Sequence, residues 1–218
     1  MQPADLLPAQ PSSSHDNAVL SDPIVSASEV FEKRNVSVLQ ILAANQNARG
    51  EIDPKSIVSG SGVMISPHLL VTNYHVIEGN NQFLSVKSSI SKEDSIWRLY
   101  KYNAVSDIAI LKTNSAHHYV REFKRLNRLK IGQKVYAIGS PKGLKNTFSE
   151  GLVSGIRVLD DQSVIQTTAS ITFGSSGGGL FDEYGDLVGI TSFGKQDGAN
   201  LNFAMPMDAV LEVLRQTK

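Results

Sequence analysis

A cluster of glycines and serines is the first place in this 218-residue chain where chemistry can be expected. The stretch FGSSGGGL, residues 173–180, sets Ser175 and Ser176 among four glycines. The flanking stretches SVIQTTASI and LFDEYGDLVGITSF are typical of strands, which argues against a flexible linker. Glycines between strands indicate a backbone bent into conformations that other residues resist. A nucleophilic serine and a plain glycine-rich loop are the two interpretations.

Two further residues supply the groups that a nucleophilic serine needs. A serine hydroxyl attacks efficiently only when a base takes its proton, and an imidazole base needs a carboxylate on its other nitrogen. His75, at the end of a predicted strand, is the candidate base. Asp107, directly before an apolar strand, is the candidate carboxylate. Each alone could be a structural histidine or a turn aspartate, but together with the serine they favour a catalytic triad.

Short strands punctuated by Gly, Asn and Asp dominate the chain and predict an all-β barrel or sandwich. They divide into groups of roughly six and five around residues 114–133, which predicts two similar β units. His75 and Asp107 fall in the first unit and Ser176 in the second, so we expect the site in the cleft between them. The predicted strands are 36–43, 56–66, 69–73, 83–89, 95–105, 107–113, 134–140, 148–159, 163–171, 187–193 and 201–206.

The two ends of the chain have other patterns. Residues 1–25 are rich in proline and serine and are expected to be a disordered arm. Ser26–Asn35 is predicted to be a short helix with a capping serine. Apolar residues at helical spacing predict a C-terminal helix over 207–217. A single domain is therefore expected over 26–218, with its β units at about 36–113 and 134–206.

Composition excludes several classes of function. The net charge is zero, so no global field favours nucleic acid or an anionic membrane. Cys is absent, which removes disulfides and thiolate metal sites. No apolar run approaches the ~20 residues of a membrane span, and the first residues lack the pattern of an intact signal peptide. His117 and His118 have no ligand-type neighbours at metal spacing, so no metal is expected.

The motifs resemble those of trypsin-like serine proteases. Residues 174–178 fit the pattern Gly-x-Ser-Gly-Gly, which selects Ser176 over Ser175, and the order His, Asp, Ser is that of chymotrypsin. The resemblance is closest to the HtrA (Deg) branch and covers about residues 27–216. It rests on SGSGVMISPHLLVTNYHVIEG, SDIAILK, LKIGQKVYAIGSPKGL, EGLVSGI, IQTTASITFGSSGGGLFDEYGDLVGITS and NFAMP, which occur in the branch's order.

The resemblance implies a fold and a mechanism. The fold would be chymotrypsin-like, with two perpendicular six-stranded β-barrels, and the activity that of an endopeptidase. Ser176 would be the nucleophile, His75 the general base and acid, and Asp107 the orienting carboxylate. The amides of Gly174 and Ser176, with Ser175 between them, would form the oxyanion hole. No cofactor is implied.

The resemblance also implies partners and a compartment. Substrates would be unfolded or extended polypeptides, and trimers are common in the branch. The resemblance is to the protease domain of the branch, without the PDZ domain that many relatives carry after the last helix, so we expect either a protease-only member or a piece of a longer protein. Family habit places the protein in the periplasm or outside the cell.

A specificity pocket is also implied. Trypsin's Asp for basic side chains would stand at Ser170, so a neutral, small-to-medium apolar side chain is expected before the scissile bond. Ile171 and Phe203 would shape that pocket. The segment TSF would offer backbone hydrogen-bond partners to an extended substrate. It consists of Thr191, Ser192 and Phe193.

Four positions depart from the usual pattern of the family. Ser175 and Thr172 replace Asn, Thr168 replaces Asp, and Gly179 replaces Pro or Ala. Gly179 is expected to loosen the turn after the nucleophile, and Ser175 excludes activation by an ion pair with a newly cut N-terminus. The alternative function is therefore a silent pseudo-protease that holds peptides, and a weaker one is an esterase.

The basic stretch 121–134 between the two β units holds six basic residues and one acid. It is interpreted as a solvated connector, with docking of an anionic partner as the less favoured alternative.

Overall fold

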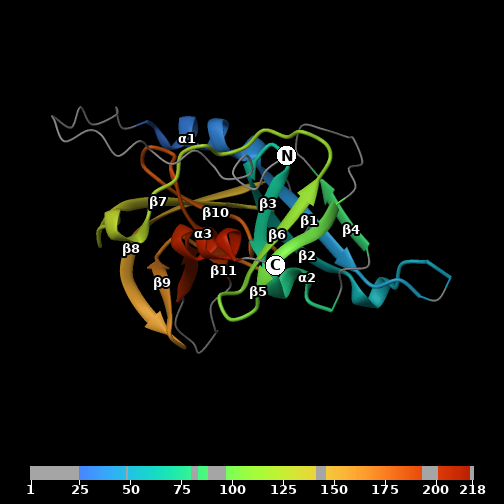
Figure 1. Cartoon of the computed structure of the whole chain (residues 1–218). Coiled ribbons are helices and arrows are strands. Elements are labelled where there is room, and N and C mark those ends of the chain that lie inside the picture. The colour runs from blue at the N-terminus through green and yellow to red at the C-terminus, as the bar shows by residue number, and fades with distance from the viewer. Residues whose placement is uncertain are drawn as a thin grey trace.

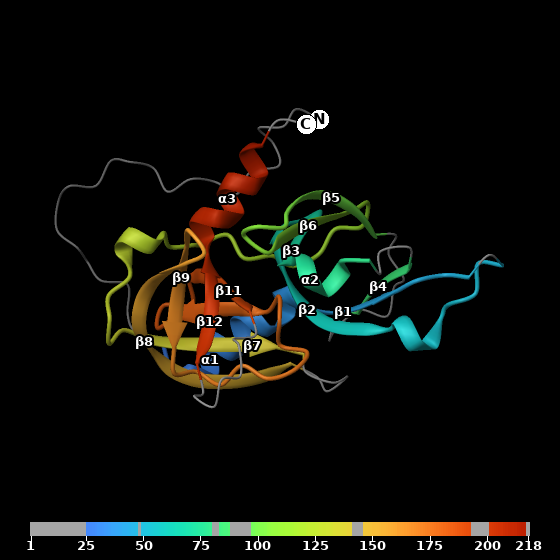
Figure 2. The same cartoon turned by 90° about the horizontal axis from the view of Figure 1, so that it is seen from below.

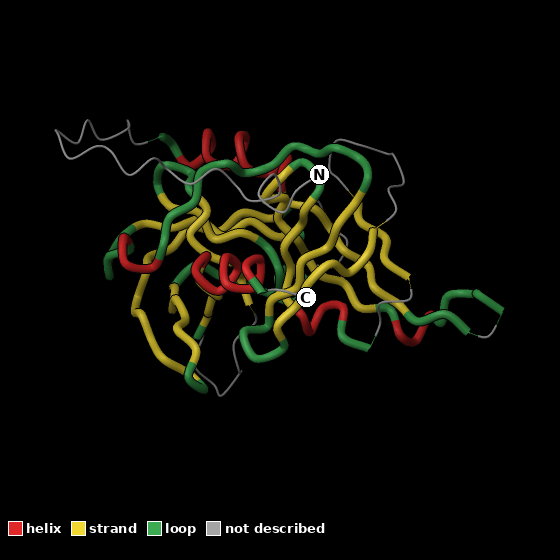
Figure 3. Tube along the Cα trace, in the orientation of Figure 1, coloured by secondary structure: helices red, strands yellow, loops and turns green. Residues whose placement is uncertain are grey.

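The computed structural model describes residues 25–47, 49–79, 83–87, 97–140, 146–192 and 201–216. The predicted N-terminal arm, apart from Val25, and the predicted substrate-binding residue Phe193 lie outside these ranges. Strands and loops make up most of the described chain, and helices lie mainly near its two ends (Figure 3). The predicted all-β class is confirmed.

The first half of the chain forms a six-stranded antiparallel sheet in the order β4-β1-β2-β3-β6-β5 (Figure 1). β4 and β5 lie next to each other at its two edges, without a ladder between them in the described residues. A short helix, α2 (Tyr74–Ile77), follows β3 directly. The strands are β1 (Val38–Ala44), β2 (Val58–Ser66), β3 (Leu69–Asn73), β4 (Phe83–Lys87), β5 (Trp97–Asn103) and β6 (Ile108–Thr113).

The second half forms a closed six-stranded barrel in the order β10-β11-β12-β9-β8-β7. Its sixth strand, β10, was missing from the predicted set because it begins at Gly179 inside the glycine-rich stretch. The strands are β7 (Lys134–Gly139), β8 (Thr147–Leu159), β9 (Gln162–Thr167), β10 (Gly179–Asp182), β11 (Leu187–Ser192) and β12 (Asn202–Pro206).

β9 is shorter than the predicted strand 163–171, because it ends at Thr167. Beyond that point the chain crosses directly over β8. A Cβ atom placed on Gly151 would lie 2.1 Å from the main-chain nitrogen of Ala169. The Thr168 hydroxyl accepts a hydrogen bond from the Leu152 amide at 2.8 Å, and the Thr168 amide donates to the Leu152 carbonyl at 3.0 Å.

Two helices flank the sheets, and both were predicted from the sequence, so those predictions are confirmed. α1 (Ala27–Arg34) begins with a capping box in which the hydroxyl of Ser26 and the carboxylate of Glu29 bond each other's main-chain amides. α3 (Met207–Arg215) continues from β12. It packs against β5 and β6 of the first sheet as well as β11 and β12 of the second (Figure 2). None of the helices in the described ranges is long and apolar enough to cross a membrane.

Strand alternation explains how the two halves join. In β6, Ala109 and Leu111 point into the interior cluster of the first sheet. Ile108 and Ile110 point the other way, into a cluster shared with the second barrel and both terminal helices. Because both faces are buried, the strand reads as a continuous apolar run. The shared cluster fixes the two halves against each other and so defines the surfaces that meet between them.

Candidate active site

His75 and Asp107 are held together by two hydrogen bonds. The imidazole Nδ1 of His75 lies 2.8 Å from Oδ2 of Asp107, and the His75 main-chain amide donates to Oδ1 at 2.9 Å. His75 stands in α2, and Asp107 directly precedes β6 as predicted. The pair fixes both the position and the tilt of the ring, with Nε2 left on the side away from the carboxylate. This is the geometry that an oriented general base needs.

Ser176 reaches the same place through strand β2. The Ser61 amide donates to the Ser176 carbonyl at 2.8 Å. A Cβ atom on Gly60 would lie 2.5 Å from Cγ1 of Val76 and 3.3 Å from the Ser176 carbonyl oxygen. The missing side chain of Gly60 therefore lets the residue after His75 and the serine turn approach the same point of β2. His75, Asp107 and the main chain of Ser176 therefore lie in one region of the molecule.

The serine loop consists of two successive turns. The Ser175 amide donates to the Thr172 carbonyl at 2.9 Å, and the Gly178 amide donates to the Ser175 carbonyl at 2.9 Å. The third residue of each turn is a glycine at positive φ, Gly174 at 90° and Gly177 at 85°. A positive φ at that position is the mark of a type II turn, which favours glycine. Glycine is therefore favoured at positions 174 and 177 because the backbone of each turn needs a positive φ there.

The predicted oxyanion hole can be compared with these turns. The Ser175 amide is already used by Thr172. Within the described part of the chain, the amides of Gly174 and Ser176 have no acceptor. They are the two amides that the resemblance assigns to the hole.

Gly179 does not loosen the turn, contrary to the expectation from sequence. It lies within β10, where it pairs with Ile190 and Ile138 on either side. A Cβ atom on it would lie 2.4 Å from the ring of Phe181. The aromatic ring thus occupies the space beside Gly179, and the start of the strand is packed.

β11 contacts both the serine loop and Asp107. The Thr191 carbonyl accepts from Gly177, its amide donates to Gly178, and its hydroxyl donates to the Ser175 carbonyl, at 2.7–2.8 Å. The amide, carbonyl and hydroxyl of Thr191 therefore all form hydrogen bonds with the serine loop. The hydroxyl of Ser192 lies 3.3 Å from Oδ2 of Asp107. Sequence reasoning gave Ser192 a backbone role only, and no sequence pattern signalled this contact.

The predicted specificity residues do not gather in one apolar cluster. Ser170 is exposed, and its carbonyl accepts from the Ser149 hydroxyl at 2.8 Å. Ile171 is buried in the interior cluster of the second barrel. Phe203 is half-buried and packs instead on the cluster shared by the two halves.

The connector is less solvated than its composition predicts. Lys124 pairs with Asp182, which is fully buried. Arg34 of α1, also buried, donates to the Gly185 carbonyl at 2.7 Å and to Glu122 at 2.9 Å. Together they tie α1 and the connector to the β10–β11 turn, whose two strands lead to the serine loop and to Ser192.

A second carboxylate, that of Asp186, belongs to the same turn. Burial, and then the neighbouring Asp182, raise the pKa of Asp186 above its ordinary range. The Asp182 carboxylate also accepts from the Tyr184 and Asp186 amides at 3.0 Å each, which fixes the turn.

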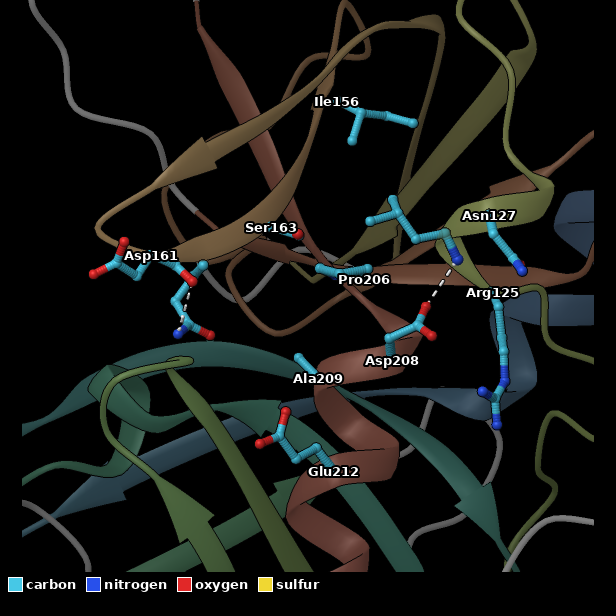
Figure 4. Close-up of a pocket in the computed structure, with 11 residues that line it drawn as sticks. Arg125, Asn127, Ile156, Asp161, Ser163, Pro206, Asp208, Ala209 and Glu212 are labelled. Atoms are coloured by element: carbon cyan, nitrogen blue, oxygen red, sulfur yellow. Dashed lines mark hydrogen bonds between the residues drawn. The ribbon is translucent and has the colours of Figure 1, made fainter.

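A hollow of about 770 Å³ lies elsewhere, between the β8–β9 hairpin, the connector and the start of α3 (Figure 4). Asp208 points from α3 to the connector, where its carboxylate accepts from the Leu126 amide at 2.8 Å. None of the predicted site residues lines this hollow. Across the described ranges, no group of three or more His, Cys, Asp or Glu side chains is arranged to hold a metal ion.

Comparison with known proteins agrees with the geometry. Residues 60–190 match the model of the trypsin-like peptidase domain. The chain belongs to the trypsin-like peptidase family. Relatives of this family that resemble the chain include three Deg-type proteins, each longer than the matched region.

The first, a probable periplasmic serine endoprotease DegP-like protein of Pseudomonas savastanoi pv. phaseolicola, is 37% identical over 73% of this chain and 34% of its own length. Protease Do-like 1, chloroplastic, of Arabidopsis thaliana is 33% identical over 86% of this chain and 46% of its own length. Serine endoprotease DegS of Haemophilus influenzae is 30% identical over 97% of this chain and 66% of its own length. The chain thus spans between a third and two thirds of these relatives.

Proposed function

We propose that the chain is a serine endopeptidase of the HtrA (Deg) type that cleaves extended or unfolded polypeptide. The observation that carries this proposal is the His75–Asp107 pair, which is joined by two hydrogen bonds and lies beside the turn of Ser176. Membership of the trypsin-like peptidase family supports the same reading.

The reaction would proceed through an acyl-enzyme. Ser176 Oγ attacks the scissile carbonyl carbon while Nε2 of His75 takes the hydroxyl proton, and Asp107 stabilises the imidazolium. The amides of Gly174 and Ser176 receive the developing oxyanion. His75 then gives the proton to the leaving amine, and a water molecule, deprotonated by His75, releases the acyl group. Losing one oxyanion donor would lower kcat by about 10²–10³-fold.

Exposed apolar side chains next to the triad residues in sequence support a polypeptide substrate. Phe173, three residues before Ser176, is 62% exposed, and Val105, two before Asp107, is 72% exposed. Such side chains suit an extended chain with apolar residues, which a folded protein keeps inside. The exposed, neutral Ser170 would favour an apolar rather than a basic residue before the scissile bond.

The proposed location rests on the names of relatives, and the proposed assembly rests on the resemblance to the branch. Some relatives are named as periplasmic, so we place the protein outside the cytoplasm, in the periplasm or secreted. Trimerisation, common in the branch, would be its assembly.

The test is a digest of casein together with fluorophosphonate labelling and mass-spectrometric mapping of the modified residue. We expect cleavage, with the label on Ser176. Ser176→Ala should abolish both, while Ser175→Ala, which removes the adjacent hydroxyl from an equally buried site, should keep the label on Ser176. Cleavage that survives Ser176→Ala would refute the triad. No labelling and no cleavage by the unaltered protein would favour the peptide-holding pseudo-protease, and hydrolysis of small esters alone would favour the esterase.

A further inference from the structure

The main chain of Asp107 has an unusual conformation. Its φ is 51°, in the left-handed region that few residues other than glycine adopt. In the described part of the chain the same holds only for Asp160 and Asp161. Those two form the tip of the β8–β9 hairpin, where a two-residue turn demands it. Asp107 is the last residue of the four-residue turn between β5 and β6, where its amide donates to the Ala104 carbonyl at 3.3 Å, and further contacts hold its carbonyl and its carboxylate.

Those contacts come from the segment that leads to His75. The Asp107 carbonyl accepts two hydrogen bonds, from the Tyr74 amide and from the side-chain Nδ2 of Asn73, both at 3.1 Å. At its other end, the Asp107 carboxylate accepts from the amide and ring of His75. The three consecutive residues 73–75 therefore form hydrogen bonds with both the main chain and the side chain of Asp107.

The side chain of Asn73 has no other task in the described structure. Asn73 occupies the N-cap position of α2, where an asparagine usually accepts from the first helical amides, yet it makes no such bond. It is fully buried, and its Oδ1 has no partner among the described residues. A buried polar group with one bond, directed at the carbonyl of Asp107, is explained by that bond rather than by helix capping.

We infer that Asn73 is a positioning residue that fixes the left-handed main chain of Asp107 and thereby aims the carboxylate at His75. The inference rests on the proposed function, because its kinetic consequence is loss of imidazole orientation. Asn73 touches no reacting atom and acts only through Asp107.

The first test is Asn73→Leu, which removes the donor and keeps nearly the same shape. Removing one partner of a buried hydrogen bond is costly when the other partner is left unsatisfied, but the Asp107 carbonyl keeps the Tyr74 amide as a donor at 3.1 Å. We expect kcat on a peptide substrate to fall by about 10–100-fold, as for a slight misplacement of a catalytic group, with KM within about twofold. Asn35→Leu is the matched control, because it removes an amide that donates to the Phe31 and Glu32 carbonyls at the end of α1. It should leave kcat unchanged.

Coupling to Asp107 separates positioning from a general structural role. If Asn73 acts through the carboxylate, Asn73→Leu should change nothing further in an Asp107→Ala background, since residues that act as a unit are strongly non-additive. Full additivity of the two changes would overturn the inference. So would a kcat of Asn73→Leu within about twofold of the unaltered protein.

A proton NMR measurement tests the same point without any catalysis. The Nδ1–H of an imidazole bonded to a carboxylate gives a low-field signal, which we expect to shift or broaden in Asn73→Leu and to persist in Asn35→Leu. An unchanged signal in Asn73→Leu contradicts the inference even if the protein cleaves no substrate. Should the leucine variant fail to fold, Asn73→Ser serves instead, because serine suits the N-cap position but is too short to keep the bond.

Discussion

The buried pair of Lys124 and Asp182 gives the sharpest prediction about stability. Lys124→Met removes the cation but keeps most of the aliphatic volume. Asp182 is fully buried, while the Lys124 side chain is 20% exposed, so the variant leaves a carboxylate inside the protein without its counter-charge. Removing one partner of a buried ion pair destabilises a protein by about 3–5 kcal/mol.

The structure places the expected value near the lower end of that range. Asp182 keeps two main-chain donors, the Tyr184 and Asp186 amides at 3.0 Å each, which continue to stabilise the negative charge. We therefore expect a loss of about 3 kcal/mol in the free energy of unfolding. For a domain of this size that corresponds to a fall in Tm of about 6–12 °C.

The assay is urea unfolding followed by circular dichroism, combined with a thermal scan. Lys130→Met is the matched control, because Lys130 lies on the same connector and is exposed. It should change stability by less than about 0.5 kcal/mol. The double variant Lys124→Met with Asp182→Asn removes both charges and should recover much of the loss. A Lys124→Met variant within about 1 kcal/mol of the unaltered protein would refute the idea that this pair ties the connector to the β10–β11 turn.

Two further predictions concern the serine loop and the pH dependence of stability. Gly177→Ala should lower the rate of fluorophosphonate labelling at Ser176 by at least about 10²-fold, because a Cβ at this positive-φ residue would lie 2.1 Å from the Ser61 carbonyl oxygen; labelling at an unchanged rate would show that the loop tolerates displacement. For Asp186, the folded state holds the proton more tightly than the unfolded chain, since burial and Asp182 raise its pKa from the ordinary 3.8. Its contribution to stability is therefore present at low pH and is lost as pH rises through the raised pKa. Asp186→Asn should be more stable than the unaltered protein at pH 7, by about 0.5 kcal/mol, with no difference below the ordinary pKa; equal stability at both pH values would argue against the shift.

The sequence by itself determined the family, the all-β class and the residues of the candidate triad. These features are local. The motifs Gly-x-Ser-Gly-Gly, Thr-Asn-x-His-Val and Ser-Asp-Ile-Ala each indicate a catalytic residue within a few positions, and the alternation of a strand is visible along a single segment. The capping box of α1 is local too, since Ser26 and Glu29 lie three positions apart.

Only the tertiary structure decided the contacts that join distant segments. The Ser192 hydroxyl on Asp107 spans 85 positions, and the bond from Arg34 to Gly185 spans 151. The left-handed Asp107 and its bond to Asn73 arise where two segments meet. Local patterns specify what each residue can do, but long-range packing decides which partner a polar group finds, because most buried donors and acceptors bond to groups that the fold brings near.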